Sequence, residues 1–356
     1  MKSVEVHQPA LLIAGPDGIT SAWLCEVLGR DNLHVADTQP IGTGQMSQTH
    51  RVTYLDGTGN SGTVVVKLAS DDPPSRAAGV GVGAYFREVT FYQRLNRQID
   101  GPTPECYLAE YDPEQGWFTL VLQDAAESRQ GDQVSGCDPI TADKAIRALA
   151  RLHAPVFDDK TIGASDYLNL PNPINQALLS ALLPGFFERY GDLIAHEHAE
   201  VCRRYVEVAD AHTADIRGPR GLVHADYRLD NLLFDRNGEC TVVDWQGVQW
   251  GPAMLDAAYF IGGSLTVEDR RAHEQRLVRS YFDTLSENGV TDFGWDRCWA
   301  EYRRQVFWGV AMTVAASMVV QRTERGDAMF MAMLQRACQQ ALDLGSLDLL
   351  PEAGRS

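Results

Sequence analysis

Acidic and amide side chains recur at fixed spacing between apolar runs over residues 224–247, HADYRLDNLLFDRNGECTVVDWQG. The apolar runs at 231–234 and 240–243 predict two short strands, and the intervening DRNG at 235–238 predicts a type I′-like turn that joins them as a hairpin. Burial of polar groups without partners is unfavourable. The pattern therefore indicates that the polar side chains at the mouth of this hairpin bind something.

Three of these side chains, Asp226, Asn231 and Asp244, would lie together at the mouth of the hairpin. Two carboxylates and an amide supply the oxygen ligands that a hard cation such as Mg²⁺ prefers. Asp226 lies in the loop before the first strand, where its carboxylate could accept a proton from a hydroxyl group. The three residues alone therefore suggest a magnesium site beside a proton acceptor.

The order His224, Asp226, Asn231 and then Asp244 after an apolar strand resembles the catalytic and metal loops of the protein-kinase-like fold. The variants His-Ala-Asp and Asp-Trp-Gln are similar to its small-molecule branch, the aminoglycoside phosphotransferase and choline-kinase-like superfamily, with ecdysteroid-kinase-like and hydroxy-acid-kinase-like relatives. The resemblance implies an enzyme that uses ATP and Mg²⁺ to phosphorylate a hydroxyl group of a small molecule. It makes Asp226 the catalytic residue, and Asn231 and Asp244 the metal ligands.

The resemblance also implies two partners for the nucleotide in the N-terminal part of the chain. Lys67 ends the apolar run VVVK, and its ammonium group would hold the α- and β-phosphates. Glu88 lies in a stretch of helical spacing and would orient Lys67. A solvated edge lysine and a solvated helix glutamate are the alternatives for either residue alone.

Two further segments are expected to contact the nucleotide through their main chain. Gly42, Gly44 and Ser47 belong to the loop IGTGQMS, where glycines let backbone N–H groups approach phosphates. The third glycine of the protein-kinase loop is absent, which leaves the individual phosphate contacts open. The segment that links the two lobes would bind adenine through the backbone of three residues: Leu122, Gln123 and Asp124.

Three other polar residues near these motifs need separate interpretations. His153 resembles a histidine that is structural in relatives. Asp256 resembles a buried aspartate that braces the catalytic loop through backbone hydrogen bonds. Arg228 could neutralise phosphate charge or pair with Asp230, and the sequence favours neither alternative.

The expected fold class is α+β, a bilobal protein-kinase-like fold. Residues 1–124 read as a β-rich N-lobe with one inserted helix at 85–97, and 71–83 as a Gly-rich loop. Two hairpins are predicted in this lobe, one joining 49–55 to 63–68 and one turning at 112–116. Residues 125–356 read as a mostly helical C-lobe that carries the catalytic and metal loops and the acceptor-binding region. A shorter helix is expected near 17–29, begun by Thr20 or Ser21.

Composition indicates which classes of partner the chain does not bind and in which cellular compartment it is expected. A chain of 356 residues is long for one compact core. Its 31 Lys and Arg against 48 Asp and Glu give a net charge of −17, so we expect no nucleic acid and no membrane as partner. Seven scattered cysteines without a Cys-x-x-Cys pair, and no secretory signal, suggest reduced thiols and a cytoplasmic location.

The sequence leaves the acceptor open. Aminoglycosides are polycations, but we find no dense cluster of carboxylates after residue 250, where apolar and aromatic residues are frequent. A small-molecule hydroxyl of unknown identity is therefore the expected acceptor. The alternatives are a catalytically inactive nucleotide-binding pseudokinase or scaffold, and a protein kinase. The sequence does not determine the oligomeric state or whether the chain uses ATP or GTP.

Overall fold

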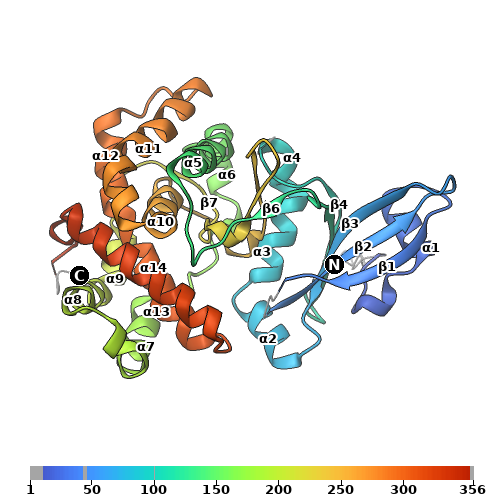
Figure 1. Ribbon diagram of the computed structural model, residues 1–356, viewed down its shortest axis with the longest axis horizontal. Helices are drawn as coiled ribbons and strands as arrows, with labels where there is room; N and C mark the ends of the chain where they lie inside the picture. The colour runs from blue at the N-terminus through green and yellow to red at the C-terminus, as the bar shows by residue number, and fades with distance from the viewer. Residues whose placement is uncertain (1–10, 43–45, 100, 353–356) are drawn as a thin grey trace, which may run out of the picture. The chain divides into compact units, whose positions relative to one another are not determined.

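The chain divides into two compact units in a computed structural model that describes residues 11–42, 46–99 and 101–352. The first unit contains the described residues up to Gln98, together with Thr103–Ala126 and Asp244–Gln246; the second contains the rest. The first is built around a β-sheet and the second is mostly helical (Figure 1). The expected α+β class is confirmed.

One antiparallel sheet of five strands, in the order β1-β2-β3-β5-β4, forms the centre of the first unit. The two predicted hairpins are confirmed as β2–β3 and β4–β5. The sheet consists of β1 (His34–Pro40), β2 (Ser47–Leu55), β3 (Ser61–Ala69), β4 (Cys106–Asp112) and β5 (Trp117–Gln123).

Alternating apolar side chains of these strands make the core of the first unit. Val64, Val66 and Leu68 on β3 are at most 2% exposed and pack with Leu24 of helix α1 (Ser21–Leu28). Side chains two positions apart lie on the same face of a strand, so Lys67, between Val66 and Leu68, points to the opposite face. This period-2 pattern separates the lysine from the cluster beneath the sheet.

The helices of the first unit differ from the prediction in number. The segment expected as a Gly-rich loop contains helix α2 (Pro73–Gly81), because Asp72 accepts a hydrogen bond from the Ser75 N–H at 2.9 Å and a proline occupies the first turn. The helix expected at 85–97 is present as α3 (Ala84–Thr90), a π-helical turn (Phe91–Leu95) and α4 (Asn96–Ile99). The expectation of one inserted helix was wrong. Of the two residues expected to begin α1, Thr20 is the N-cap, since its side chain accepts a hydrogen bond from the Trp23 N–H.

Two small antiparallel sheets position the loops of the second unit. β7 (Arg220–Val223) pairs with β10 (Gln249–Pro252), and β6 (Arg129–Gln130), β8 (Leu232–Phe234) and β9 (Cys240–Val242) pair in the order β6-β8-β9. The predicted hairpin is β8–β9, with a hydrogen bond from the Gly238 N–H to the Asp235 carbonyl at 2.9 Å. Gly238 has φ +74° and the two residues before it do not have positive φ, so the type I′ prediction was wrong.

Helices make up most of the second unit and cover the small sheets. Helix α10 is buried along its whole length and packs against α5, α11, α13 and α14 (Figure 1). No helix in the described part of the chain is long and apolar enough to cross a membrane. The helices are α5 (Pro139–His153), α6 (Lys160–Gly163), α7 (Gln176–Tyr190), α8 (His196–Val206), α9 (Ala209–Ala214), α10 (Leu255–Ser264), α11 (Val267–Glu287), α12 (Trp295–Arg304), α13 (Trp308–Val319) and α14 (Glu324–Asp343).

Candidate active site

A buried lysine between two carboxylates lies in the first unit. Lys67 on β3 is 8% exposed, and its Nζ is 2.8 Å from Glu88 Oε2 on α3 and 2.7 Å from Asp244 Oδ1. Burial alone would lower the pKa of Lys67, but Asp244 and Glu88 outweigh it and raise the pKa above its ordinary value. The lysine is therefore a fixed positive charge at neutral pH.

Asp244 reaches this pair from a strained backbone position. Its φ is +68°, which is uncommon for a residue with a side chain. The next residue, Trp245, is 1% exposed, and its indole stacks on the Phe91 ring with centroids 3.9 Å apart and planes 9° apart. This stacking anchors the segment that presents the Asp244 carboxylate to Lys67. Sequence reasoning identified Asp244 but missed the role of Trp245 and Phe91.

The glycine loop is described only in part. Gly42 has φ +76°, and a Cβ added there would meet no atom within 4 Å, whereas Gly44 lies outside the described residues. Ser47 begins β2, and its Oγ accepts a hydrogen bond of 3.4 Å from Gln246 Nε2. The described residues therefore place open backbone at Gly42 and a buried hydroxyl at Ser47.

The three residues expected to contact adenine lie at the end of β5. Leu122 and Gln123 are the last two residues of the strand, and Asp124 comes directly after it. Leu122 and Gln123 pair with Val65 and Val64 of β3. The carboxylate of Asp124 is 2% exposed and accepts hydrogen bonds from Arg51 Nε at 2.7 Å and Nη2 at 3.2 Å. That side chain is thus occupied by an ion pair that the sequence did not indicate, because residues 51 and 124 are distant in the chain.

In the second unit, three side chains converge on the carboxylate of Asp226. Arg228 Nε donates to Oδ1 at 2.9 Å and lies 3.1 Å from Oδ2, Asn231 Nδ2 donates to Oδ2 at 2.8 Å, and the Tyr259 hydroxyl donates to Oδ1 at 3.2 Å. Arg228 Nη1 also donates to Asp230 at 2.7 Å. Of the two interpretations of Arg228, pairing with Asp230 is confirmed, and the additional bond to Asp226 was not predicted.

Asp256 holds the loop that carries Asp226. Its Oδ2 accepts from the His224 N–H at 2.6 Å, and its Oδ1 accepts from the Ala225 N–H at 2.9 Å. His224 Nε2 lies 3.0 Å from the Val243 carbonyl, which links the loop to the end of the hairpin. Because two backbone N–H groups bind one fully buried carboxylate, the bracing role predicted for Asp256 is confirmed.

His153 has a structural environment. It is 2% exposed, and its Nδ1 lies 2.7 Å from the hydroxyl of Tyr281, which is itself fully buried. Its Nε2 lies 3.7 Å from Asp256 Oδ2. These buried contacts agree with the structural role expected for His153, and the proximity to Asp256 was not predicted.

Comparisons with known proteins identify the family and the fold. A model of the phosphotransferase enzyme family matches residues 39–298. A kinase-like protein of Caenorhabditis elegans is 28% identical over 227 residues, or 58% of this chain; the match spans 57% of that relative, less than two thirds of its length.

Solved structures with a similar fold include the ethanolamine kinase of Plasmodium vivax, with a TM-score of 0.51, 11% identity and coverage of 85% of this chain and 82% of that one. The choline kinase of Streptococcus pneumoniae has a TM-score of 0.48 and 15% identity, with coverage of 87% and 94%. The likeness to the ethanolamine kinase shows the kinase-like fold.

Proposed function

The chain belongs to the phosphotransferase enzyme family, and we propose that it transfers the γ-phosphoryl group of ATP to a hydroxyl group of a small molecule. In this reaction the acceptor oxygen bonds to the γ-phosphorus, and the bond from that phosphorus to the bridging oxygen of ADP breaks. The proton of the acceptor hydroxyl passes to a base. Since the transition state of phosphoryl transfer is loose, positioning and charge stabilisation supply most of the rate enhancement.

The observation that carries the proposal is the position of Lys67 between Glu88 and Asp244. A buried ammonium group with its pKa raised stays charged, so it suits polyanionic phosphate groups. Glu88, on a neighbouring helix, keeps the lysine side chain in one orientation. We assign Lys67 to the α- and β-phosphates, and Gly42, Gly44 and Ser47 to the phosphate loop. The backbone of Leu122, Gln123 and Asp124 is assigned to the adenine.

We assign Mg²⁺ to Asn231 and Asp244, whose side chains carry oxygen donors of the kind that this ion prefers. Asn231 uses its Nδ2 to bind Asp226, which leaves its Oδ1 as an oxygen donor, and Asp244 adds a carboxylate. Mg²⁺ typically takes one or two protein carboxylates and completes its shell with water and phosphate oxygens. The described residues contain no group of three or more His, Cys, Asp or Glu placed to hold a metal, and this chemistry does not require one. When bound, Mg²⁺ would neutralise charge on the phosphate oxygens.

Asp226 is assigned to the acceptor hydroxyl. Its carboxylate is held by Arg228, Asn231 and Tyr259, so its orientation is fixed before the acceptor binds. A carboxylate held in this way orients the hydroxyl and takes its proton as the new bond forms.

A coupled assay of ADP release, run over a panel of hydroxylated metabolites and antibiotics, tests the role of Asp226. For an acceptor that the parent protein turns over, Asp226→Asn should lower kcat by about 10² to 10⁴ while the affinity for ATP stays nearly unchanged, because this residue handles the acceptor rather than the nucleotide. Asp235→Asn, in the turn of the same hairpin, is the matched control and should keep parental turnover. Equal turnover by Asp226→Asn and the parent would refute the assignment.

A further inference from the structure

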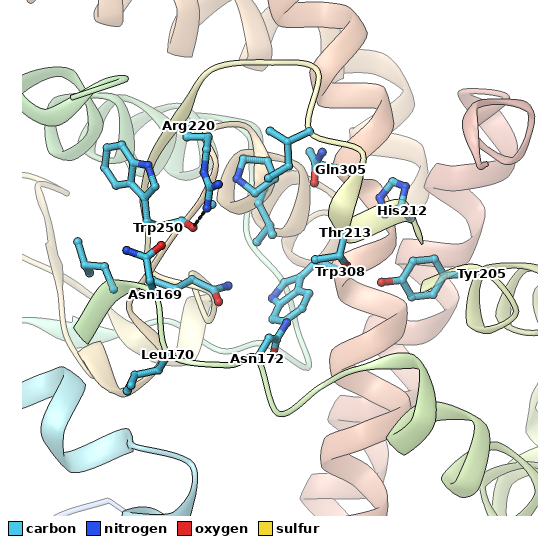
Figure 2. Close-up of a pocket in the computed structure, with 16 residues that line it drawn as sticks. Asn169, Leu170, Asn172, Tyr205, His212, Thr213, Arg220, Trp250, Gln305 and Trp308 are labelled. Atoms are coloured by element: carbon cyan, nitrogen blue, oxygen red, sulfur yellow. Dashed lines mark hydrogen bonds between the residues drawn. The ribbon is translucent and has the colours of Figure 1, made fainter. Parts of the chain in front are cut away.

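A cavity of about 230 Å³ lies in the second unit against strands β7 and β10 (Figure 2). Three of the residues that line it are connected to the loop that carries Asp226. The Trp308 indole lines the cavity and donates from Nε1 to the Ala225 carbonyl at 2.7 Å. Leu255 precedes the bracing Asp256, and Gln249 pairs with Val223, which ends β7 just before His224. Trp308 thus both lines the cavity and bonds to the loop that carries Asp226, and two other lining residues adjoin residues next to that loop.

The walls of the cavity are aromatic and neutral-polar. Tyr205, Trp250 and Trp308 supply aromatic surface, and the amides come from Asn169, Asn172, Gln249 and Gln305. No aspartate or glutamate is found among the described residues that line it. The cation in the lining, Arg220, has Nη2 bonded to the Trp250 carbonyl at 2.7 Å. An amine-rich ligand would therefore meet a guanidinium group and no carboxylate.

Two polar side chains in this cavity have a buried nitrogen atom without a protein partner. His212 is 7% exposed, and Figure 2 shows it and Arg220 at the cavity. Within the described residues, no hydrogen bond is made by His212 Nδ1 or by Arg220 Nε. Buried polar groups are rarely left unpaired, because this costs about 1–3 kcal/mol each. Unpaired groups in a cavity indicate a ligand that supplies the missing hydrogen bonds.

The charge state of His212 limits the kind of ligand. Burial, and next the nearby Arg304, lower its pKa to about 4, although Asp215 opposes them. At neutral pH the imidazole is therefore uncharged, and with the neutral amides it can exchange donor and acceptor hydrogen bonds with hydroxyl groups. A polycation is not the natural complement of such a lining, which contains a guanidinium group and, among the described residues, no carboxylate.

We propose that this cavity binds the phosphoryl acceptor, and that the acceptor is an uncharged compound with several hydroxyl groups beside an apolar face, of the kind found in glycosides. The inference rests on the proposed phosphotransferase function and adds the substrate class. Gln305, His212 and Gln249 bond the hydroxyl groups, and the indole and phenol rings contact the apolar face. The bond from Trp308 to the Ala225 carbonyl connects this cavity to the loop that carries Asp226.

Calorimetric titration of the full chain without nucleotide tests the proposal. The probes are 4-nitrophenyl β-D-glucopyranoside as an uncharged glycoside, kanamycin as a polycation and gluconate as an anionic polyol. We expect the glycoside to bind at least about tenfold more tightly than either other probe. Gln305→Leu keeps the side chain's size but removes its amide, and should weaken glycoside binding about fivefold to tenfold. Gln249→Leu, on β10, is a second variant in the cavity with the same expected direction.

Gln98→Leu, at an exposed position of helix α4, is the matched control and should leave glycoside affinity unchanged. Tighter binding of kanamycin or gluconate, or equal affinities in the parent and both cavity variants, would overturn the proposal. Transfer of labelled γ-phosphate is followed separately. Glycoside binding without any transfer would contradict the phosphotransferase function, whereas transfer to kanamycin in preference to the glycoside would contradict only the acceptor class.

Discussion

At the scale of single residues, two strained backbone positions present the candidate catalytic groups. Ala225 has φ +64° and Asp244 has φ +68°. Left-handed backbone at residues with a Cβ costs about 1–2 kcal/mol each and persists where the surroundings enforce it. Here Asp256 binds the Ala225 N–H, Trp308 binds its carbonyl, and Lys67 binds the Asp244 carboxylate. The strain is thus offset by contacts from residues far away in the sequence.

The sequence predicted the identity of the main site residues but not all of their contacts. Asp226, Asn231 and Asp244 fall within one short stretch, so their spacing identified them. The bond from Arg228 to Asp226 depends on side-chain direction, which spacing does not determine. The pairing of Arg51 with Asp124 depends on two strands meeting in the sheet. Gly44 lies outside the described residues, so the expectation for it remains a prediction.

Buried His212 predicts a specific dependence of stability on pH. Its pKa of about 4 lies below the ordinary value of 6.5, so the unfolded chain binds the proton first as pH falls. The free energy of unfolding should therefore decrease from about pH 6.5 down to about pH 4, by on the order of 2–3 kcal/mol from this residue. Urea unfolding of the parent and of His212→Gln across this range measures the effect. The parent should lose more stability than the variant, and parallel profiles would contradict the prediction.

At the scale of elements, the strands were easier to predict than the helix boundaries. The alternation of apolar residues in 63–68 and the turn residues at 112–116 are local signals, and both hairpins formed as expected. Helix α2 was missed because its glycines and small residues resemble a loop, whereas its stability depends on a cap and a proline at the start. The β8–β9 turn has the expected position but a different backbone type, since φ at each turn residue is not encoded by the pattern of apolar residues.

Helix α2 offers a direct test of the cap. Asp72 is exposed and accepts from the Ser75 N–H at 2.9 Å, so Asp72→Ala should lower the free energy of unfolding, because this N–H loses its cap. Asp71→Ala changes the neighbouring carboxylate, which does not cap the helix, and serves as the control. Chemical denaturation compares the two variants with the parent. An equal loss of stability in both would show that charge, and not the cap, is responsible.

At the scale of the whole molecule, the α+β class followed from β-rich and helical halves of the sequence. The cavity beside β7 and β10 did not follow, because its lining comes from segments between residues 168 and 308 that only the fold brings together. The net charge of −17 is a property of the whole chain and gives no information about this cavity, whose described lining contains no carboxylate. The acceptor class could therefore be inferred only from the arrangement of side chains.

The proposed mechanism requires one magnesium nucleotide to bind both Asn231, in the second unit, and Asp244, in the first. A double-mutant cycle measures whether two residues act on the same ligand. Calorimetric titration of ATP, with and without Mg²⁺, into the parent, Asn231→Ala, Asp244→Ala and the double variant provides the four affinities. The control Asp235→Ala removes a carboxylate from the β8–β9 turn and should bind ATP like the parent.

We predict that each single substitution removes most of the Mg²⁺-dependent gain in ATP affinity, about tenfold or more, and that the double variant loses little beyond either one. The two losses are then coupled because both side chains bind the same ion. Losses that simply add, or an unchanged dependence on Mg²⁺ in either single variant, would contradict the convergence of these residues on one nucleotide.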